Sequence, residues 1–138
     1  MASRRGVGAV HVGRRGLAGG VVAAALTALA RLGAPASSVR AVLGPAIGPC
    51  CYELPTDSVD AVAVSVPTAR GTTSWGAPSL DLPAGVRAQL AAAGATVDPA
   101  APPCTRCSGN DWFSHRADAA AGRQLAIVLR WPALAATG

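Results

Sequence analysis

The apolar side chains of this sequence are nearly all small, and this limits how the chain can build a core. Hydrophobic residues make up 51% of the 138 residues, yet there is only one Phe and one Tyr. Because alanine and valine bury little area each, a stable core requires neighbouring elements to pack closely. The length suits one domain, and no apolar stretch is long enough to span a membrane. We therefore expect a single domain over residues 1–138 with modest stability.

The charged residues and cysteines restrict the classes of partner and compartment. Twelve basic residues, all of them Arg, face seven acidic ones, which gives a net charge of +5. The arginines are scattered and no aromatic residues are interleaved with them, so we expect no nucleic-acid partner. Four cysteines, two of them adjacent, do not form the pattern of a secreted disulfide framework. They indicate reduced thiols and a cytoplasmic protein.

The hydrophobic patterning and the Gly and Pro breaks predict a mixed α/β class, with a mixed β-sheet packed against helices. Asp81 is expected to cap the second long helix and Gly94 to end it. Residues 57–66 fit either a helix or an extended segment, and residues 112–116 a turn or short helix. The expected elements are strands at residues 7–12, 39–43 and 124–131, helices at residues 17–32 and 82–93, and an exposed loop at residues 69–79.

A series of short motifs follows in one order along the chain. It runs HVGRRGLAGG from His11, GPAIGPCCYE from Gly44, DLPAGVRAQL from Asp81, CTRC from Cys104, then WFSHR and GRQLAIVL. The series resembles the C-terminal half of the YfiH family, also called the laccase-domain or peptidoglycan-editing-factor family. That family typically shows HAGWRG, GPCIGPCCYEV, a DL...QL helix, CT..C, FFSYR and TGRQA. The resemblance covers residues 8–129, and it implies a partial YfiH-like fold for this chain.

The resemblance implies a zinc enzyme that acts on purine nucleosides, by phosphorolysis and by hydrolytic deamination of adenosine. It makes His11 one of three zinc ligands, the other two lying in the family's N-terminal half. Zinc with an open fourth position lowers the pKa of bound water to about 7. Arg15 would then hold phosphate in two places near the metal. The implied substrate-binding residues are Gly48, Cys50, Tyr52, Arg116 and Arg123, and the implied small-molecule partners are a purine nucleoside and phosphate.

The sequence also departs from the family pattern. Val12 and Arg14 replace the Ala and Trp of HAGWRG, so a cation stands beside the expected zinc ligand. The segment that carries the other two zinc ligands has no counterpart within these 138 residues. An upstream segment or a second chain in a homo-oligomer would complete the site. The competing hypothesis is a non-catalytic accessory protein that exposes an apolar face and associates through it.

Several alternatives remain open at this point. The same family chemistry would suit an editing hydrolase that removes an amino acid from a UDP-sugar precursor of peptidoglycan. Paired arginines before an apolar run also resemble an export signal, whose cleavage after Ala36 would remove His11 and Arg15. A laccase-type multicopper centre is not among them, because it needs many imidazole ligands and the chain has two His.

Some side chains have two interpretations each. Cys104 and Cys107 have the spacing of a zinc knuckle, and Cys50 and Cys51 would have to join them, although adjacent cysteines rarely both reach one tetrahedral ion. Buried structural thiols are otherwise the commoner role for such cysteines. For the arginines of the closing motifs, pairing with Asp111 or Asp118 competes with phosphate binding. His115 is expected to pack or form a hydrogen bond.

Overall fold

The first helical region is broken where the sequence predicted one continuous helix. In the computed structural model, which describes residues 1–130, α1 spans Arg14–Ala18 and α2 spans Val21–Arg31. Gly20 lies between them with φ of +78°, a left-handed conformation that interrupts the helix and favours glycine. The strand predicted at residues 7–12 is also wrong, since Val7 forms only an isolated bridge with Ala2.

The described strands form two small sheets instead of one larger sheet. β1 (Arg40–Ala41) lies within the predicted strand at residues 39–43 and pairs in parallel with β4 (Thr96–Val97). β2 (Arg70–Thr72) and β3 (Pro78–Leu80) form an antiparallel hairpin. The prediction of an exposed loop at residues 69–79 is therefore wrong, because these residues form most of the hairpin and Ser79 and Leu80 are fully buried. The mixed α/β class is confirmed.

The other two α-helices settle one open choice and confirm one prediction. α3 (Thr56–Ala63) shows that the undecided segment is helical. α4 (Leu82–Ala92) is capped as expected, because a carboxylate oxygen of Asp81 accepts a hydrogen bond from the N–H of Ala84 at 2.8 Å. Gly94 follows the helix with φ of +79°, the conformation expected of a helix stop.

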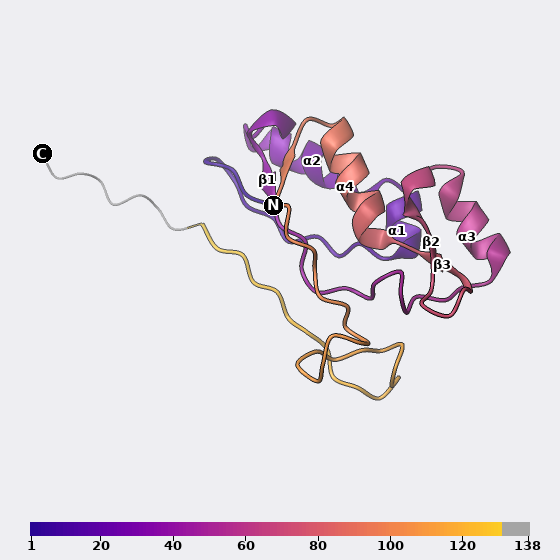
Figure 1. Cartoon of the computed structure of the whole chain (residues 1–138). Coiled ribbons are helices and arrows are strands. Elements are labelled where there is room, and N and C mark those ends of the chain that lie inside the picture. The colour runs from indigo at the N-terminus through magenta and orange to yellow at the C-terminus, as the bar shows by residue number, and fades with distance from the viewer. Residues whose placement is uncertain (131–138) are drawn as a thin grey trace, which may run out of the picture.

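The core lies between α4 and the elements that pack on it. Figure 1 shows α2 and α4 side by side, with α1 below them. Leu17, Leu80 and Leu90 are almost completely buried there. Gly85 of α4 allows the close approach, since a Cβ at this position would lie 2.8 Å from Cδ2 of Leu17 and 3.0 Å from Cβ of Ala69. The small side chains thus provide the tight packing that the composition requires.

The chain beyond β4 has a different character. Residues 98–130 contain turns and bends but no helix or paired strand (Figure 1). A strand was predicted at residues 124–131, but residues 124–130 form none, so the prediction is wrong for these residues. Trp131 lies outside the described residues. Leu125, Ile127 and Leu129 are exposed there, because no partner strand covers them within the described part of the chain. No described helix has both the length and the apolarity to cross a membrane.

Candidate functional site

Two loops that are far apart in sequence meet at the candidate site. The GPAIGPCCYE loop follows β1, and the CTRC segment follows β4. The N–H of Ala46 donates to the carbonyl of Pro103 at 3.2 Å, and the N–H of Thr105 donates to the carbonyl of Ala46 at 3.0 Å. These bonds form a short parallel bridge. The parallel pairing of β1 with β4 is therefore followed by a second, isolated parallel bridge that holds the two loops against each other.

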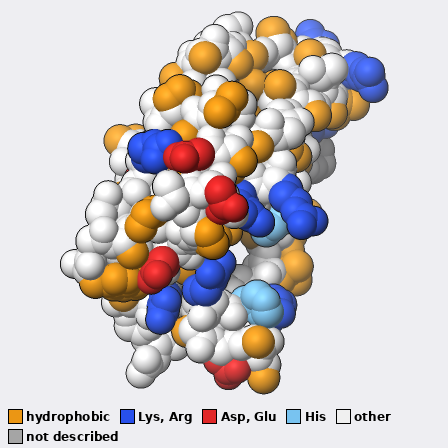
Figure 2. Space-filling model, turned by 90° about the vertical axis from the view of Figure 1, so that its right-hand side faces the viewer, with side chains coloured by type: hydrophobic (Ala, Val, Ile, Leu, Met, Phe, Trp, Pro, Cys, Tyr) orange, Lys and Arg blue, Asp and Glu red, His pale blue; other side chains and the backbone are white. Residues whose placement is uncertain are grey.

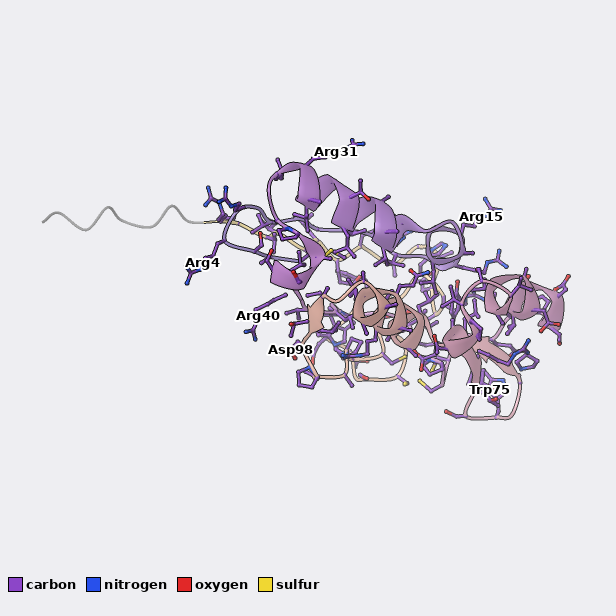
Figure 3. The ribbon with its side chains drawn as sticks, turned by 90° about the horizontal axis from the view of Figure 1, so that it is seen from above. Arg4, Arg15, Arg31, Arg40, Trp75 and Asp98 are labelled. Atoms are coloured by element: carbon purple, nitrogen blue, oxygen red, sulfur yellow. The ribbon has the colours of Figure 1, made fainter. Side chains whose placement is uncertain are left out.

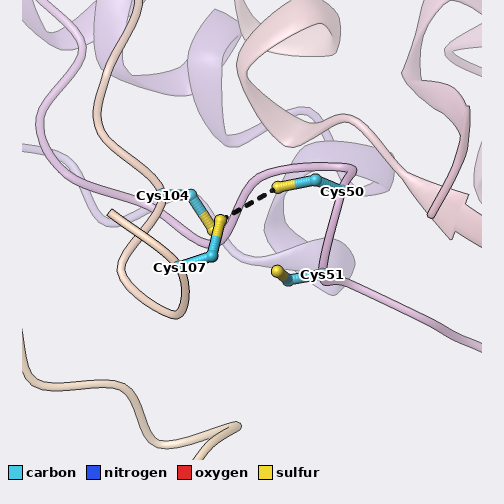
Figure 4. A group of neighbouring side chains, drawn as sticks. All are labelled: Cys50, Cys51, Cys104 and Cys107. Atoms are coloured by element: carbon cyan, nitrogen blue, oxygen red, sulfur yellow. Dashed lines mark hydrogen bonds between the residues drawn. The ribbon is translucent and has the colours of Figure 1, made fainter. Parts of the chain in front are cut away.

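The bridge places all four cysteines in one group (Figure 4). The Sγ atoms of Cys50, Cys51, Cys104 and Cys107 all lie within 4.8 Å of one another. The Sγ atoms of Cys50 and Cys107 are 3.5 Å apart. A tight turn makes this arrangement possible, because the N–H groups of both Cys51 and Tyr52 donate to the carbonyl of one residue, Gly48. Adjacent cysteines thus do reach a common centre, against the expectation from sequence.

The thiols of the group have strongly different acidities. Burial acts to raise the pKa of Cys104, but hydrogen bonds from the backbone N–H groups of Gly48, Arg106 and Cys107 outweigh it and lower the pKa to about 6. The N–H of Gly48 lies 3.2 Å from Sγ of Cys104. Burial, and then hydrogen bonding with Cys107, raises the pKa of both Cys50 and Cys51. Cys104 is therefore more acidic than Cys50 and Cys51.

An open cavity of about 490 Å³ adjoins the cysteine group. Two arginines, Arg106 and Arg116, and the carboxylate of Glu53 contribute its charges. Figure 2 shows a face on which arginine, histidine and acidic side chains gather around a hollow. The remaining lining residues are Cys51, Leu54, Pro55, Thr56 and Pro78. The guanidinium groups of this cavity suit an anion, and its carboxylate suits the hydroxyls of a sugar.

The two arginines of the cavity are held by aromatic rings and backbone oxygens. The guanidinium of Arg116 lies 4.9 Å from the ring centroid of Tyr52 and donates to the carbonyl of Glu53 at 3.3 Å. That of Arg106 lies 5.9 Å from the ring of Trp75 and donates to the carbonyl of Cys51 at 3.4 Å. Neither arginine forms an ion pair with an acid within residues 1–130. The alternative that Arg116 pairs with Asp111 or Asp118 is wrong.

Arg123 and His115 form a separate pair in the C-terminal segment. Nη2 of Arg123 lies 3.3 Å from Nδ1 of His115, and Nη1 donates to the carbonyl of Gly122 at 3.0 Å. This agrees with the expected hydrogen-bonding role of His115. No hydrogen bond or cation–π contact among the described residues joins Arg123 to Tyr52 or Arg116, so its predicted substrate role stays a prediction.

His11 and Arg15 lie at the start of the helical region. His11 is exposed just before α1, and Arg15, within α1, is exposed as well. Figure 3 shows Arg15 directed outward beside α1, while Trp75 lies at the hairpin in the lower part of the view. Among residues 1–130, His11 belongs to no group of three or more His, Cys, Asp or Glu side chains. The described residues therefore do not complete a three-ligand zinc site around His11.

The comparisons with known proteins agree with this picture. The family model described as multi-copper polyphenol oxidoreductase laccase matches residues 1–131. The chain belongs to this family. Purine nucleoside phosphorylase ORF3 of Streptomyces griseus is 50% identical over 122 residues, covering 88% of this chain and 49% of the relative. Purine nucleoside phosphorylase YlmD of Geobacillus stearothermophilus is 36% identical and covers 90% of this chain and 48% of the relative.

A solved structure supports the family fold. The hypothetical protein YfiH of Bacillus licheniformis matches with a TM-score of 0.63 at 32% identity, over 80% of this chain and 44% of that chain. Protein NMB0706 of Neisseria meningitidis gives a TM-score of 0.61 at 33% identity. The chain thus spans about half the length of the proteins it matches, which confirms the predicted resemblance to part of a YfiH-type protein.

The structure also adds residues that sequence reasoning missed. Glu53 and Arg106 line the cavity, and Trp75 contacts both of them: its Nε1 donates to a carboxylate oxygen of Glu53 at 2.8 Å, and its ring lies 5.9 Å from the guanidinium of Arg106. The sequence carried a signal for two of them, because Glu53 ends the GPAIGPCCYE motif and Arg106 lies inside CTRC. Trp75 carried no such signal, since it lies in a segment that was interpreted as an exposed loop. Of the predicted site residues, the structure brings together Gly48, Cys50, Tyr52 and Arg116.

Proposed function

We propose that this chain provides the C-terminal part of a purine nucleoside phosphorylase site. The observation that carries the proposal is the 50% identity to a relative with that name over 88% of this chain. The reaction transfers the ribosyl group: a phosphate oxygen bonds to C1′ of the sugar, the bond from C1′ to the purine nitrogen breaks, and the base leaves with the proton that hydrogen phosphate gives up. The products are ribose 1-phosphate and the free base.

The residues of this chain would act by binding and orientation. Arg15 has a guanidinium with the fork geometry that grips phosphate in two places, and this guanidinium is exposed and makes no side-chain hydrogen bond to the described residues. Arg116 beside Tyr52 offers a second guanidinium next to an aromatic ring. The turn at Gly48 and Cys50 shapes the loop that carries that ring. Holding an anion in line with the scissile bond is the main contribution such groups make to this reaction.

The proposal also includes two more specific points, namely that the enzyme depends on zinc and that it deaminates adenosine. His11 would supply one ligand, and a metal held there would activate water for deamination. Because the described residues supply His11 no further ligands, the remaining ones would come from another segment or chain. Deamination of adenosine by water would give inosine and ammonia.

The test is phosphate-dependent release of hypoxanthine from inosine by the purified chain. Arg15→Ala should raise the KM for phosphate by roughly 10- to 150-fold, the effect of one charged hydrogen-bonding group. Arg31→Ala, an exposed arginine in the last turn of α2, is the matched control and should leave KM unchanged. Release of base that does not depend on phosphate, or no release at all, would contradict phosphorylase activity in this chain. An amino acid released from a UDP-sugar precursor would instead support the editing hydrolase.

A second candidate function is that of a non-catalytic partner protein. It is favoured by the exposed apolar side chains of Leu125, Ile127 and Leu129 in a segment without pairing among the described residues. Such side chains favour association with a complementary chain or with a second copy. A concentration-dependent mass in sedimentation, together with no nucleoside turnover, would support this function over the enzyme. A monomer that turns over inosine would exclude it.

A further inference from the structure

The cysteine group has the dimensions of a tetrahedral metal site. With zinc–sulfur bonds of about 2.3 Å, the sulfurs of a tetrahedral tetrathiolate lie about 3.8 Å apart. Here all four Sγ atoms lie within 4.8 Å of one another. The longest separation therefore has to shrink by only about 1 Å, which small side-chain rotations provide. All four sulfurs point toward a common centre from two separate loops (Figure 4).

The loops that carry the thiols are held in place by bonds that do not involve the sulfurs. The N–H of Ser74 donates to the carbonyl of Cys50 at 3.1 Å, and the N–H of Cys104 donates to Oγ of Ser108 at 3.0 Å. The bridge between Ala46 and Cys104 fixes the two loops against each other. The site is thus largely preformed, which reduces the cost of ordering it around an ion.

The donor set and the nearby charge select the kind of ion. Four thiolates are soft ligands, which favour zinc over the hard cations magnesium and calcium. A zinc ion with four thiolates carries a net charge of −2, and Arg106 lies between two of the ligands in sequence with its guanidinium on the carbonyl of Cys51. A cation at this place offsets the negative charge of the cluster.

We propose that Cys50, Cys51, Cys104 and Cys107 bind one zinc ion in tetrahedral coordination, and that this ion fastens the CTRC segment to the GPAIGPCCYE loop. The site is separate from His11 and does not depend on the proposed phosphorylase activity. Its role is structural, because four protein ligands leave no open position on the metal. The ion thereby holds the wall of the neighbouring cavity, to which Cys51 and Arg106 both contribute.

Metal analysis of the full chain tests the proposal directly. The chain is purified under reducing conditions with zinc present, and its zinc content is measured beside His11→Ala and Cys107→Ser. Cys107 is exposed, so serine there should leave the core intact, as circular dichroism would check. We expect one zinc per chain in the wild type and in His11→Ala. Cys107→Ser should bind zinc roughly hundredfold more weakly or worse, because it loses a ligand.

Cobalt substitution reports the ligand set independently of affinity. Co²⁺ in the metal-free chain should give the intense visible bands of a tetrahedral site with thiolate charge transfer, and these should weaken in Cys107→Ser and persist in His11→Ala. Loss of zinc in His11→Ala with retention in Cys107→Ser would overturn the proposal in favour of a metal at His11. No bound zinc in a chain with four free thiols would also overturn it, as would a disulfide between Cys50 and Cys107 that persists through purification in the presence of a reductant.

Discussion

The two parts of the molecule, residues 14–97 and residues 98–130, are held by different forces. In the first part, leucines and valines from several helices and the hairpin are buried against one another. In the second, Cys104 and Ser114 are the buried side chains within the described residues, and the guanidinium groups of two arginines donate to backbone carbonyls of the GPAIGPCCYE loop. Apolar burial stabilises the helical part, whereas the loop part depends on polar contacts and, in our proposal, on a metal ion.

The largest expected effect tests this contrast with two leucines. Leu90→Ala removes a side chain that is 1% exposed and should lower the free energy of unfolding by about 2–5 kcal/mol. Leu125→Ala removes one that is 83% exposed and should change it by less than about 0.5 kcal/mol. Urea unfolding of both variants measures the difference. Equal losses would mean that Leu125 is packed in solution, and the contrast between the two parts would fail.

A pH series tests the loop part in the metal-free chain. The folded-state pKa of Cys104 is below its ordinary value of 9.0, at about 6. Its thiolate therefore adds stability that is fully present above about pH 9 and is lost as the pH falls through about 6. The stability difference between wild type and Cys104→Ser should grow as the pH rises over this range. The raised pKa values of Cys50 and Cys51 act in the opposite direction only above about pH 9, where the unfolded chain loses their protons, so they leave this range unaffected.

The measurement is urea unfolding in the presence of a chelator and a reductant at several pH values. Thiolate absorbance in the ultraviolet should show one thiol titrating near the lower end of the range. A stability difference that is constant with pH would mean that the hydrogen bonds from Gly48 and its neighbours do not hold a thiolate.

The close approach in the helical part gives a prediction of intermediate size. Gly85→Ala should destabilise the fold by about 1–3 kcal/mol, because the new Cβ would lie 2.8 Å from Leu17. At an ordinary helix position, alanine is more stable than glycine by about 0.5–1 kcal/mol. The expected effect of Gly85→Ala on stability therefore has the opposite sign to the difference in helix propensity. Ala91→Gly, at an exposed position of the same helix, is the control and should lose only that propensity difference. A gain in thermal stability for Gly85→Ala would contradict the packing.

The smallest expected effect concerns the helix cap. Asp81→Ala removes the carboxylate that accepts the N–H of Ala84 and should cost about 1 kcal/mol of unfolding free energy. Asp81→Asn keeps a side-chain oxygen in place and should stay within a few tenths of a kcal/mol of the wild type. Thermal unfolding measures both. An alanine variant as stable as the wild type would show that tertiary packing of α4, and not its cap, fixes the start of the helix.

The features that could be predicted from the sequence are those set by neighbouring residues. The cap at Asp81 and the stop at Gly94 depend on the conformations of a few adjacent residues, and both are confirmed. The order of the motifs led to the family, which the comparisons confirm. The helix predicted over residues 17–32 was right in type, but the Gly19–Gly20 pair was not recognised as a break.

The strand predictions failed where pairing decides the outcome. The apolar segment at residues 124–130 has the composition of a strand, yet it has no partner within the described residues. The segment around Trp75 has the composition of a loop, yet β2 and β3 pair there because Leu80 is buried against the core. A strand forms only where a second chain segment completes its hydrogen bonds, and composition does not show which segment that is.

By itself, the sequence of this protein determined the ends of α4, the class of fold and the family, because these follow from local conformation and from the order of short motifs. Only the tertiary structure decided that Cys50 and Cys51 lie against Cys104 and Cys107, and that Arg116 lies on Tyr52. The physical reason is that the parallel pairing of β1 with β4 brings together loops more than fifty residues apart. No local preference of either loop specifies that contact.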